Sequence, residues 1–141
     1  MTVFADSSAL VKLYADEPGA ALVRRLGHVV VSTLARVEVP AALWRKHRTG
    51  ELSAQDAGLL AADFAADWHE PAGPFIPVVV QGQVLERAAA LVAGHGLRAY
   101  DGVQLACAAA AREADPQVDA FLCFDDALNE AAAREGFELV R

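Results

Sequence analysis

Short runs of β-branched and aromatic residues alternate along this chain with longer stretches of helical periodicity. The apolar runs lie at residues 2–5, 28–32, 75–80, 120–124 and 137–140. Strands that alternate with helices form a parallel sheet with helices on both faces. The sequence therefore predicts an α/β three-layer sandwich, in which a central, mostly parallel sheet of four to five strands is flanked by helices.

The segments between these runs carry start and stop signals of helices. Ser53 precedes a long amphipathic stretch as an N-cap, and Gly136 ends the last helical stretch. Pro18 stands at a favoured first-turn position of a second helix. Pro40 either kinks the helix expected over 33–50 or marks its first turn, and the sequence leaves both open.

Size and composition indicate a compact globular protein. The chain has 141 residues, of which 55% are hydrophobic and 22% charged, and no Pro/Gly/Ser-rich linker divides it. We therefore expect a single domain over 1–141, large enough to hold its core without disulfides or a structural metal. Cys107 and Cys123 lack CxxC spacing and are expected to be small core residues of a reduced compartment. Without a basic leader or a membrane-length apolar run, the expected location is the cytoplasm.

The charge balance bears on the class of partner. The formal net charge is −7, whereas proteins that hold nucleic acid by phosphate neutralisation are usually basic. That objection weakens where several acids surround a divalent cation, because the bound ion reverses the local field.

Four acidic residues stand where a parallel sheet gathers functional groups. Asp6 follows the first apolar run and Asp125 follows the fourth, while Glu38 and Asp101 lie in the first turns of two helices. Right-handed crossovers bring strand ends and helix starts to one edge of the sheet, so we expect these carboxylates to converge there. Each acid taken alone is also a common helix cap or turn residue.

Converging carboxylates repel one another unless a cation neutralises them. All four offer hard oxygen ligands, and no cysteine or histidine lies at ligand spacing beside them, which favours Mg²⁺ or Mn²⁺ over Zn²⁺. One or two such ions activate water and shield the charge that develops when a phosphodiester is hydrolysed.

Four segments carry a resemblance to a known family: DSSALVKLY, VSTLARVEVPAAL, LRAYDGVQLACA and FLCFDDALNEAA. In this order and spacing they resemble the acidic segments of PIN-domain proteins of the VapC type, over almost the whole chain. The resemblance implies a PIN-like fold and a Mg²⁺- or Mn²⁺-dependent ribonuclease. It also implies a homodimer and inhibition by a small VapB-like antitoxin encoded beside it.

Carried over by position, the family's acids match Asp6, Glu38, Asp101 and Asp125 as metal-binding and catalytic residues. The fourth position has two neighbouring alternatives. Asp119 should sit at the opposite end of its strand, and Asp126 should point away as the next helix begins. The family's small hydroxyl residue beside the metal is matched by Ser7 or Ser32, each of which is also a plausible helix cap.

Further residues have both a functional and a structural interpretation. Arg36 and Arg98 lie close in sequence to proposed ligands and could hold phosphate or pair with a carboxylate. The basic cluster 45–48 could grip RNA or stabilise a helix end, and Lys12 could assist the leaving group or be an ordinary surface residue. An apolar stripe is most simply core, although the resemblance places an antitoxin groove there; its members are Trp44, Leu59, Leu60, Phe64 and Trp68.

The acids predict metal-dependent hydrolysis of phosphodiesters, and the resemblance implies an endoribonuclease that acts as the toxin of a type II toxin–antitoxin module. A catalytically weak binding module that sequesters a DNA-binding antitoxin is the alternative. A phosphoacceptor receiver domain is disfavoured, because no Asp follows the third apolar run and no Lys occurs beyond Lys46. The RNA cut, the number of ions and the identity of the antitoxin are left open.

Overall fold

The computed structural model describes residues 1–141, and all of its strands belong to one sheet. The five strands lie in the order β3-β2-β1-β4-β5, and every neighbouring pair is parallel. Their bounds are Thr2–Ala5 (β1), Val29–Ser32 (β2), Phe75–Val78 (β3), Val118–Leu122 (β4) and Glu138–Leu139 (β5). The predicted fold class is confirmed, and the sheet is parallel throughout.

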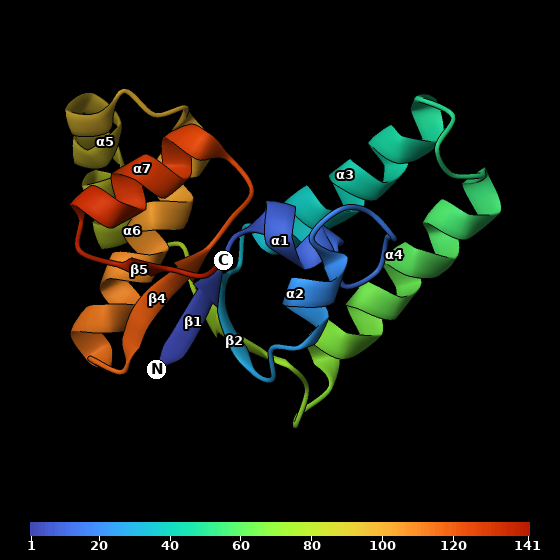
Figure 1. Cartoon of the computed structure of the whole chain (residues 1–141), viewed down its shortest axis with the longest axis horizontal. Coiled ribbons are helices and arrows are strands. Elements are labelled where there is room, and N and C mark those ends of the chain that lie inside the picture. Colours follow the sequence, from blue (N-terminus) through green and yellow to red (C-terminus); the bar gives the residue numbers. More distant parts are fainter.

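Helices cover both faces of this sheet (Figure 1). One layer contains α5, α6 and α7, and the other contains α1 to α4, with α3 and α4 packed as a pair. The bounds are Ser7–Val11 (α1), Ala20–Arg24 (α2), Ala35–Arg48 (α3), Ala54–His69 (α4), Gly82–His95 (α5), Ala99–Ala114 (α6) and Asp126–Arg134 (α7).

Side chains that alternate along the central strands contribute to two hydrophobic cores, one on each face of the sheet. On β1, Phe4 packs with the α5–α7 layer, whereas Val3 and Ala5 pack with the α1–α4 layer. On β4, Phe121 and Leu122 divide in the same way. Strand residues alternate between faces, so a strand buried on both faces reads as a continuous apolar run.

Local signals near the helix ends were right in most places. Ser53 caps α4 by accepting a hydrogen bond from Asp56 N–H, as expected. The expectation for Pro18 was wrong, because α2 begins at Ala20 after Gly19, whose φ of 94° is left-handed and suits glycine. Pro40 lies inside α3, five residues beyond its first residue, so it does not mark the first turn.

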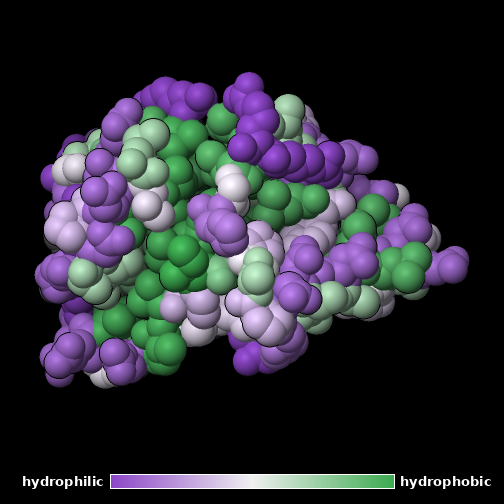
Figure 2. Space-filling model, turned by 90° about the horizontal axis from the view of Figure 1, so that it is seen from below, coloured by the Kyte–Doolittle hydropathy of each residue, from purple (hydrophilic) through white to green (hydrophobic).

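Apolar side chains are left uncovered on the surface. In the view from below Figure 1, a band of hydrophobic residues crosses the face between hydrophilic margins (Figure 2). The exposed large apolar residues of the chain include Met1, Val37, Leu59, Ile76 and Val79. Contiguous exposed apolar surface commonly marks an interaction site.

None of the helices has the length and apolar character needed to cross a membrane.

Candidate active site

The order of the strands places a crevice beyond β1 and β4. The connections that leave β1 and lead toward β4 run in opposite directions across the sheet, so ligands are expected outside the carboxyl ends of these two strands. Asp6 directly follows β1, and its N–H donates to Leu122 O at the end of β4, 3.1 Å away. Asp125 follows β4 as the N-cap of α7.

The four acids expected to converge line one cavity of about 460 Å³. Its walls also carry two arginines, two aromatic rings and several small or amide side chains. The complete lining is Asp6, Ser7, Ser8, Val11, Glu38, Ala42, Arg45, Arg98, Ala99, Tyr100, Asp101, Gln104, Phe124 and Asp125. Neither Asp119, near the start of β4, nor Asp126 is part of it. The geometry therefore favours Asp125 as the fourth acid.

Asp6 is the most buried of the four acids, with 5% of its surface exposed. Its Oδ1 caps α1, accepting from Ala9 N–H at 3.1 Å and from Ser8 Oγ at 2.7 Å. Burial raises the pKa of Asp6 to about 7 against these two hydrogen bonds, and the charges of Glu38 and Asp101 raise it further. The carboxylate is therefore held in place but poorly compensated as an anion.

Glu38 is held through one oxygen by two neighbours. Its Oε1 accepts from Ser7 Oγ at 2.9 Å and from Gln104 Nε2 at 2.7 Å, and Gln104 also donates to Ser7 Oγ at 3.0 Å. The other atom of that amide, Gln104 Oε1, is buried without a hydrogen-bond partner. Gln104 was not among the residues expected at the site, although its place three residues after Asp101 puts both on one face of α6.

Arg98 joins the two remaining acids. Its guanidinium donates to Asp101 Oδ2 at 3.2 Å and to Asp125 Oδ2 at 3.3 Å, while Asp125 Oδ1 accepts from Leu128 N–H at 2.9 Å. The Arg98 side chain is 80% exposed, so these bonds are screened by water. Of the two roles considered for Arg98, carboxylate pairing is the one observed.

Three of the four carboxylates have an oxygen that no protein group hydrogen-bonds. Asp6, Glu38 and Asp101 each have one oxygen without a protein hydrogen bond, and the second oxygen of Asp125 is bonded only to Arg98. As they stand, no three Asp, Glu, His or Cys side chains are grouped closely enough to coordinate one ion. Shared coordination would therefore require small side-chain movements, including displacement of Arg98.

Comparison with known proteins identifies the family. The family model described as "PIN domain" matches residues 3–134. The chain belongs to the PIN-domain family. Two curated relatives from Mycobacterium tuberculosis are each 35% identical over 112 residues, which is 77% of this chain and 75% of each relative. They are named Ribonuclease VapC45 (strain CDC 1551 / Oshkosh) and Ribonuclease VapC49 (strain ATCC 25618 / H37Rv).

The expected family is therefore confirmed, and the matched range of residues spans the positions of all four acids. Two other expectations at the site differ from the structure. Arg36 lies over the Trp68 ring, 5.9 Å from its centroid, and does not line the cavity. Ser32 is fully buried, where it accepts from Leu34 N–H and from the Cys107 thiol. The N-cap of α3 is Leu34, which makes no side-chain cap, so Ser32 does not cap that helix. Ser7 and Ser8 are the hydroxyl residues at the acids, because they donate to Glu38 and Asp6 respectively.

The basic residues divide between the cavity and a separate ion-pair network. Arg45 is exposed in the cavity wall, seven residues beyond Glu38 on the same face of α3. Lys12 and Lys46 instead both bind Glu17. Burial alone would raise the pKa of Glu17, but its bonds to the two lysines lower it. Lys12 is thus a buried ion-pair residue, contrary to both interpretations of it.

The apolar stripe on α4 is partly core. Phe64 is 2% exposed and packs against Tyr14, Trp68 and Phe75, so it cannot reach a partner. Leu59, by contrast, is 57% exposed on the same helix.

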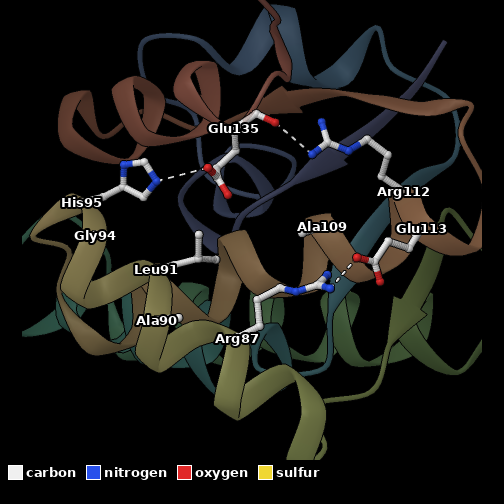
Figure 3. A pocket seen from close by; sticks show the side chains of 9 residues that line it. All are labelled: Arg87, Ala90, Leu91, Gly94, His95, Ala109, Arg112, Glu113 and Glu135. Atoms are coloured by element: carbon white, nitrogen blue, oxygen red, sulfur yellow. Dashed lines mark hydrogen bonds and ion pairs between the residues drawn. The ribbon is translucent and has the colours of Figure 1, made fainter.

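A second cavity, of about 530 Å³, lies between α5, α6 and α7 (Figure 3). Its charged side chains are occupied with one another: Arg87 pairs with Glu113, His95 lies 3.4 Å from a Glu135 carboxylate oxygen, and Arg112 donates to Glu135 O. No cluster of free acids or cations points into it. The acid-lined cavity is therefore the candidate active site of this PIN domain.

Proposed function

We propose that this chain is a divalent-metal-dependent endoribonuclease and the toxin component of a type II toxin–antitoxin module. One observation carries the proposal. In a PIN-domain chain related to proteins named ribonucleases, acids from four separate segments line one cavity, and three of them, Asp6, Glu38 and Asp101, each have an oxygen without a protein hydrogen bond. Such a set suits cation binding better than structural stabilisation, because like charges brought together destabilise the fold.

The donor set fits Mg²⁺ or Mn²⁺. The cavity wall contains carboxylate, hydroxyl and amide oxygens but no histidine or cysteine. The unpartnered amide oxygen of Gln104 is a further sign of a missing donor, which a hydrated cation would bring in its water shell. The charge balance agrees, since four carboxylates face only the guanidinium groups of Arg45 and Arg98.

Within this site the side chains have separate roles. Asp6, Glu38, Asp101 and Asp125 would hold one or two ions, and a bound ion would supply water activation and charge shielding at the phosphorus. Ser7 and Gln104 orient Glu38 by holding one of its oxygens.

The two arginines would act on the RNA itself. Arg45 makes no ion pair and is free to bind a phosphate oxygen of RNA. Arg98 would exchange its carboxylate partners for phosphate when the cation arrives.

The decisive experiment is RNA cleavage by purified protein on a mixture of single-stranded and structured RNAs. EDTA should abolish cleavage, and Mg²⁺ or Mn²⁺ should restore it. Asp101→Asn should lose several powers of ten in rate, whereas Asp119→Asn and Asp126→Asn, outside the cavity, serve as matched controls. Cleavage that persists in EDTA would refute the proposed chemistry. Sequencing the RNA ends after brief induction would identify the target.

The exposed apolar surface supports the proposal that this protein binds other protein chains. We propose a homodimer and a complex with a VapB-like antitoxin, because a single chain leaves the band in Figure 2 uncovered. We propose that the antitoxin binds the α3–α4 pair, where Trp44 and Leu59 are exposed. Both cysteines are buried free thiols, in keeping with a reducing compartment such as the cytoplasm.

The alternative is a PIN-fold module that acts mainly by sequestering a DNA-binding antitoxin. The presence of all four acids argues against it. It predicts that the protein with Asp101→Asn still relieves antitoxin-dependent DNA binding as well as wild type, with no RNA cleaved by either protein.

A further inference from the structure

Two exposed aromatic rings border the acid-lined cavity. Tyr100 directly precedes Asp101, and Phe124 directly precedes Asp125; both rings are part of the cavity wall. They are 64% and 40% exposed. Most other aromatic side chains of the chain lie in buried or half-buried stacks, such as Phe4 with Phe121.

The Phe124 ring is packed against Gly19 and Lys12. A Cβ at Gly19 would come within 2.5 Å of Phe124 Cε1, so the ring occupies space that only glycine leaves open. Lys12 Nζ lies 4.3 Å from the ring centroid, close enough for a cation–π contact. Besides these contacts, 40% of the surface of Phe124 stays exposed to solvent.

The backbone ties the same residue to the acids. Phe124 N–H donates to Ser8 Oγ at 3.1 Å, and Ser8 Oγ donates to Asp6 Oδ1 at 2.7 Å. The ring is therefore held at a set place relative to the most buried carboxylate. An ordinary surface phenylalanine would have no such link to the site.

Tyr100 is exposed for a different reason. It lies in the first turn of α6, where Arg98 joins Asp101 to Asp125, and its hydroxyl makes no hydrogen bond within the chain. The ring contributes nothing to either core. It presents a flat apolar face beside the groups expected to meet a phosphate.

Flat apolar faces next to phosphate-binding groups match the chemistry of an unpaired nucleotide. We propose that Phe124 and Tyr100 are stacking platforms for nucleobases adjoining the phosphate at the acids, and that they restrict the site to unpaired RNA. This inference rests on the proposed function. Stacking on aromatic side chains is sequence-tolerant, and base pairing in a duplex hides the faces it needs.

The test measures binding separately from cleavage. Single-stranded RNA containing 2-aminopurine, whose fluorescence is quenched by stacking, would be titrated with protein in Ca²⁺ in the cold, with RNA integrity checked by electrophoresis. Tyr100→Ala and Phe124→Leu should weaken binding by between about 5-fold and 150-fold each and reduce the quenching. Tyr100→Phe keeps the ring and should bind as wild type.

Three controls make the result specific. Leu85→Ala removes an exposed large apolar side chain outside the cavity and should leave RNA affinity unchanged. A matched RNA with abasic residues should bind wild type and Tyr100→Ala alike. Melting temperatures would confirm folding, and Tyr100→Ala carries the test if Phe124→Leu does not fold.

The opposing outcomes are distinct. If wild type cleaves RNA but Tyr100→Ala and Phe124→Leu bind it as tightly as wild type, the stacking platforms are refuted while the proposed function stands. Variants that bind RNA normally but lose the antitoxin would show a protein contact instead. A wild type that binds Mn²⁺ but neither binds nor cleaves RNA would refute both.

Discussion

Gln104 Nε2 donates to Glu38 Oε1 across 2.7 Å, although the two residues are 66 positions apart in the chain. The same nitrogen donates to Ser7 Oγ, so one amide joins α6, α3 and α1 in the wall of the acid-lined cavity. The amide's orientation follows from its partners, because Glu38 can only accept when ionised. Gln104 is thus a positioning residue for Glu38.

Replacing Gln104 with Leu should weaken metal binding. The change leaves Glu38 Oε1 with Ser7 alone, and loss of a partner that orients a metal ligand typically costs about 10- to 100-fold in affinity or activity. Isothermal titration with Mn²⁺ would measure the change, with circular dichroism as a check of folding. An unchanged affinity in the folded variant would mean that Gln104 serves only the core.

Asp6 should make the metal-free protein less stable as the pH rises from about 4 to about 7. Its pKa is raised from 3.8 to about 7 in the folded chain, chiefly by burial, so the native state binds more protons than the unfolded state in this window. Stability is therefore greatest at the acidic end and falls as pH rises through the folded pKa. The difference amounts to a few kcal/mol at most.

The measurement is urea unfolding in EDTA at several pH values, with wild type compared with Asp6→Asn. Asparagine still caps a helix but does not titrate, so the variant should lack this part of the slope. In wild type, Mn²⁺ affinity should rise with pH over the same range, since the bound proton must leave. Parallel pH profiles of the two proteins would show that Asp6 is not the titrating group.

Arg98 should compete with the cation for two of its ligands. Its guanidinium bonds both Asp101 and Asp125, so Arg98→Ala should bind Mn²⁺ severalfold more tightly while binding RNA more weakly. Because the side chain is 80% exposed, the free energy of unfolding should change by less than about 1 kcal/mol. Arg24→Ala, which removes an exposed pair with Asp16, is the matched control. Weaker Mn²⁺ binding by Arg98→Ala would contradict the competition.

The sequence was enough to predict which acids gather at one edge of the sheet, because strand ends and helix starts are local signals and the parallel topology brings them together. That is why Asp6 and Asp125 were expected beside each other. Arg36 was wrongly expected at the site because it is close to Glu38 in the sequence. Side chains two residues apart on a helix point in different directions, so Arg36 faces Trp68 while Glu38 faces the cavity.

Periodicity also could not tell which apolar residues of α4 are core. Leu59 and Phe64 belong to one stripe in the sequence, yet only the packing of α4 on α3 and β3 decides that Phe64 is inside. The Lys12–Glu17–Lys46 network could not be predicted for a similar reason, because Lys46 in α3 is 29 positions away from Glu17 in the chain.

Leu59→Glu should weaken the antitoxin complex more than tenfold without unfolding the chain. Leu59 is 57% exposed on the α3–α4 pair, so a carboxylate there stays in water until a partner covers it. Leu85→Glu, at a similarly exposed position on α5, is the control. Phe64→Glu should instead abolish folding, because its side chain is buried. Equal affinities of Leu59→Glu and wild type would place the antitoxin elsewhere.

The proposed metal centre is most severely tested by combining substitutions. If Asp6, Glu38, Asp101 and Asp125 position ions that lower a single barrier, losing any one disables the same step, so their effects should be strongly non-additive. Asp6→Asn and Asp101→Asn should each cost several powers of ten in RNA cleavage, and the double variant should cost little more than either. Rates would be measured at saturating Mn²⁺, with folding checked by circular dichroism. Losses that multiply in the double variant would indicate that Asp6 and Asp101 contribute independently, and full cleavage by the double variant would assign the activity to another site or to a contaminant.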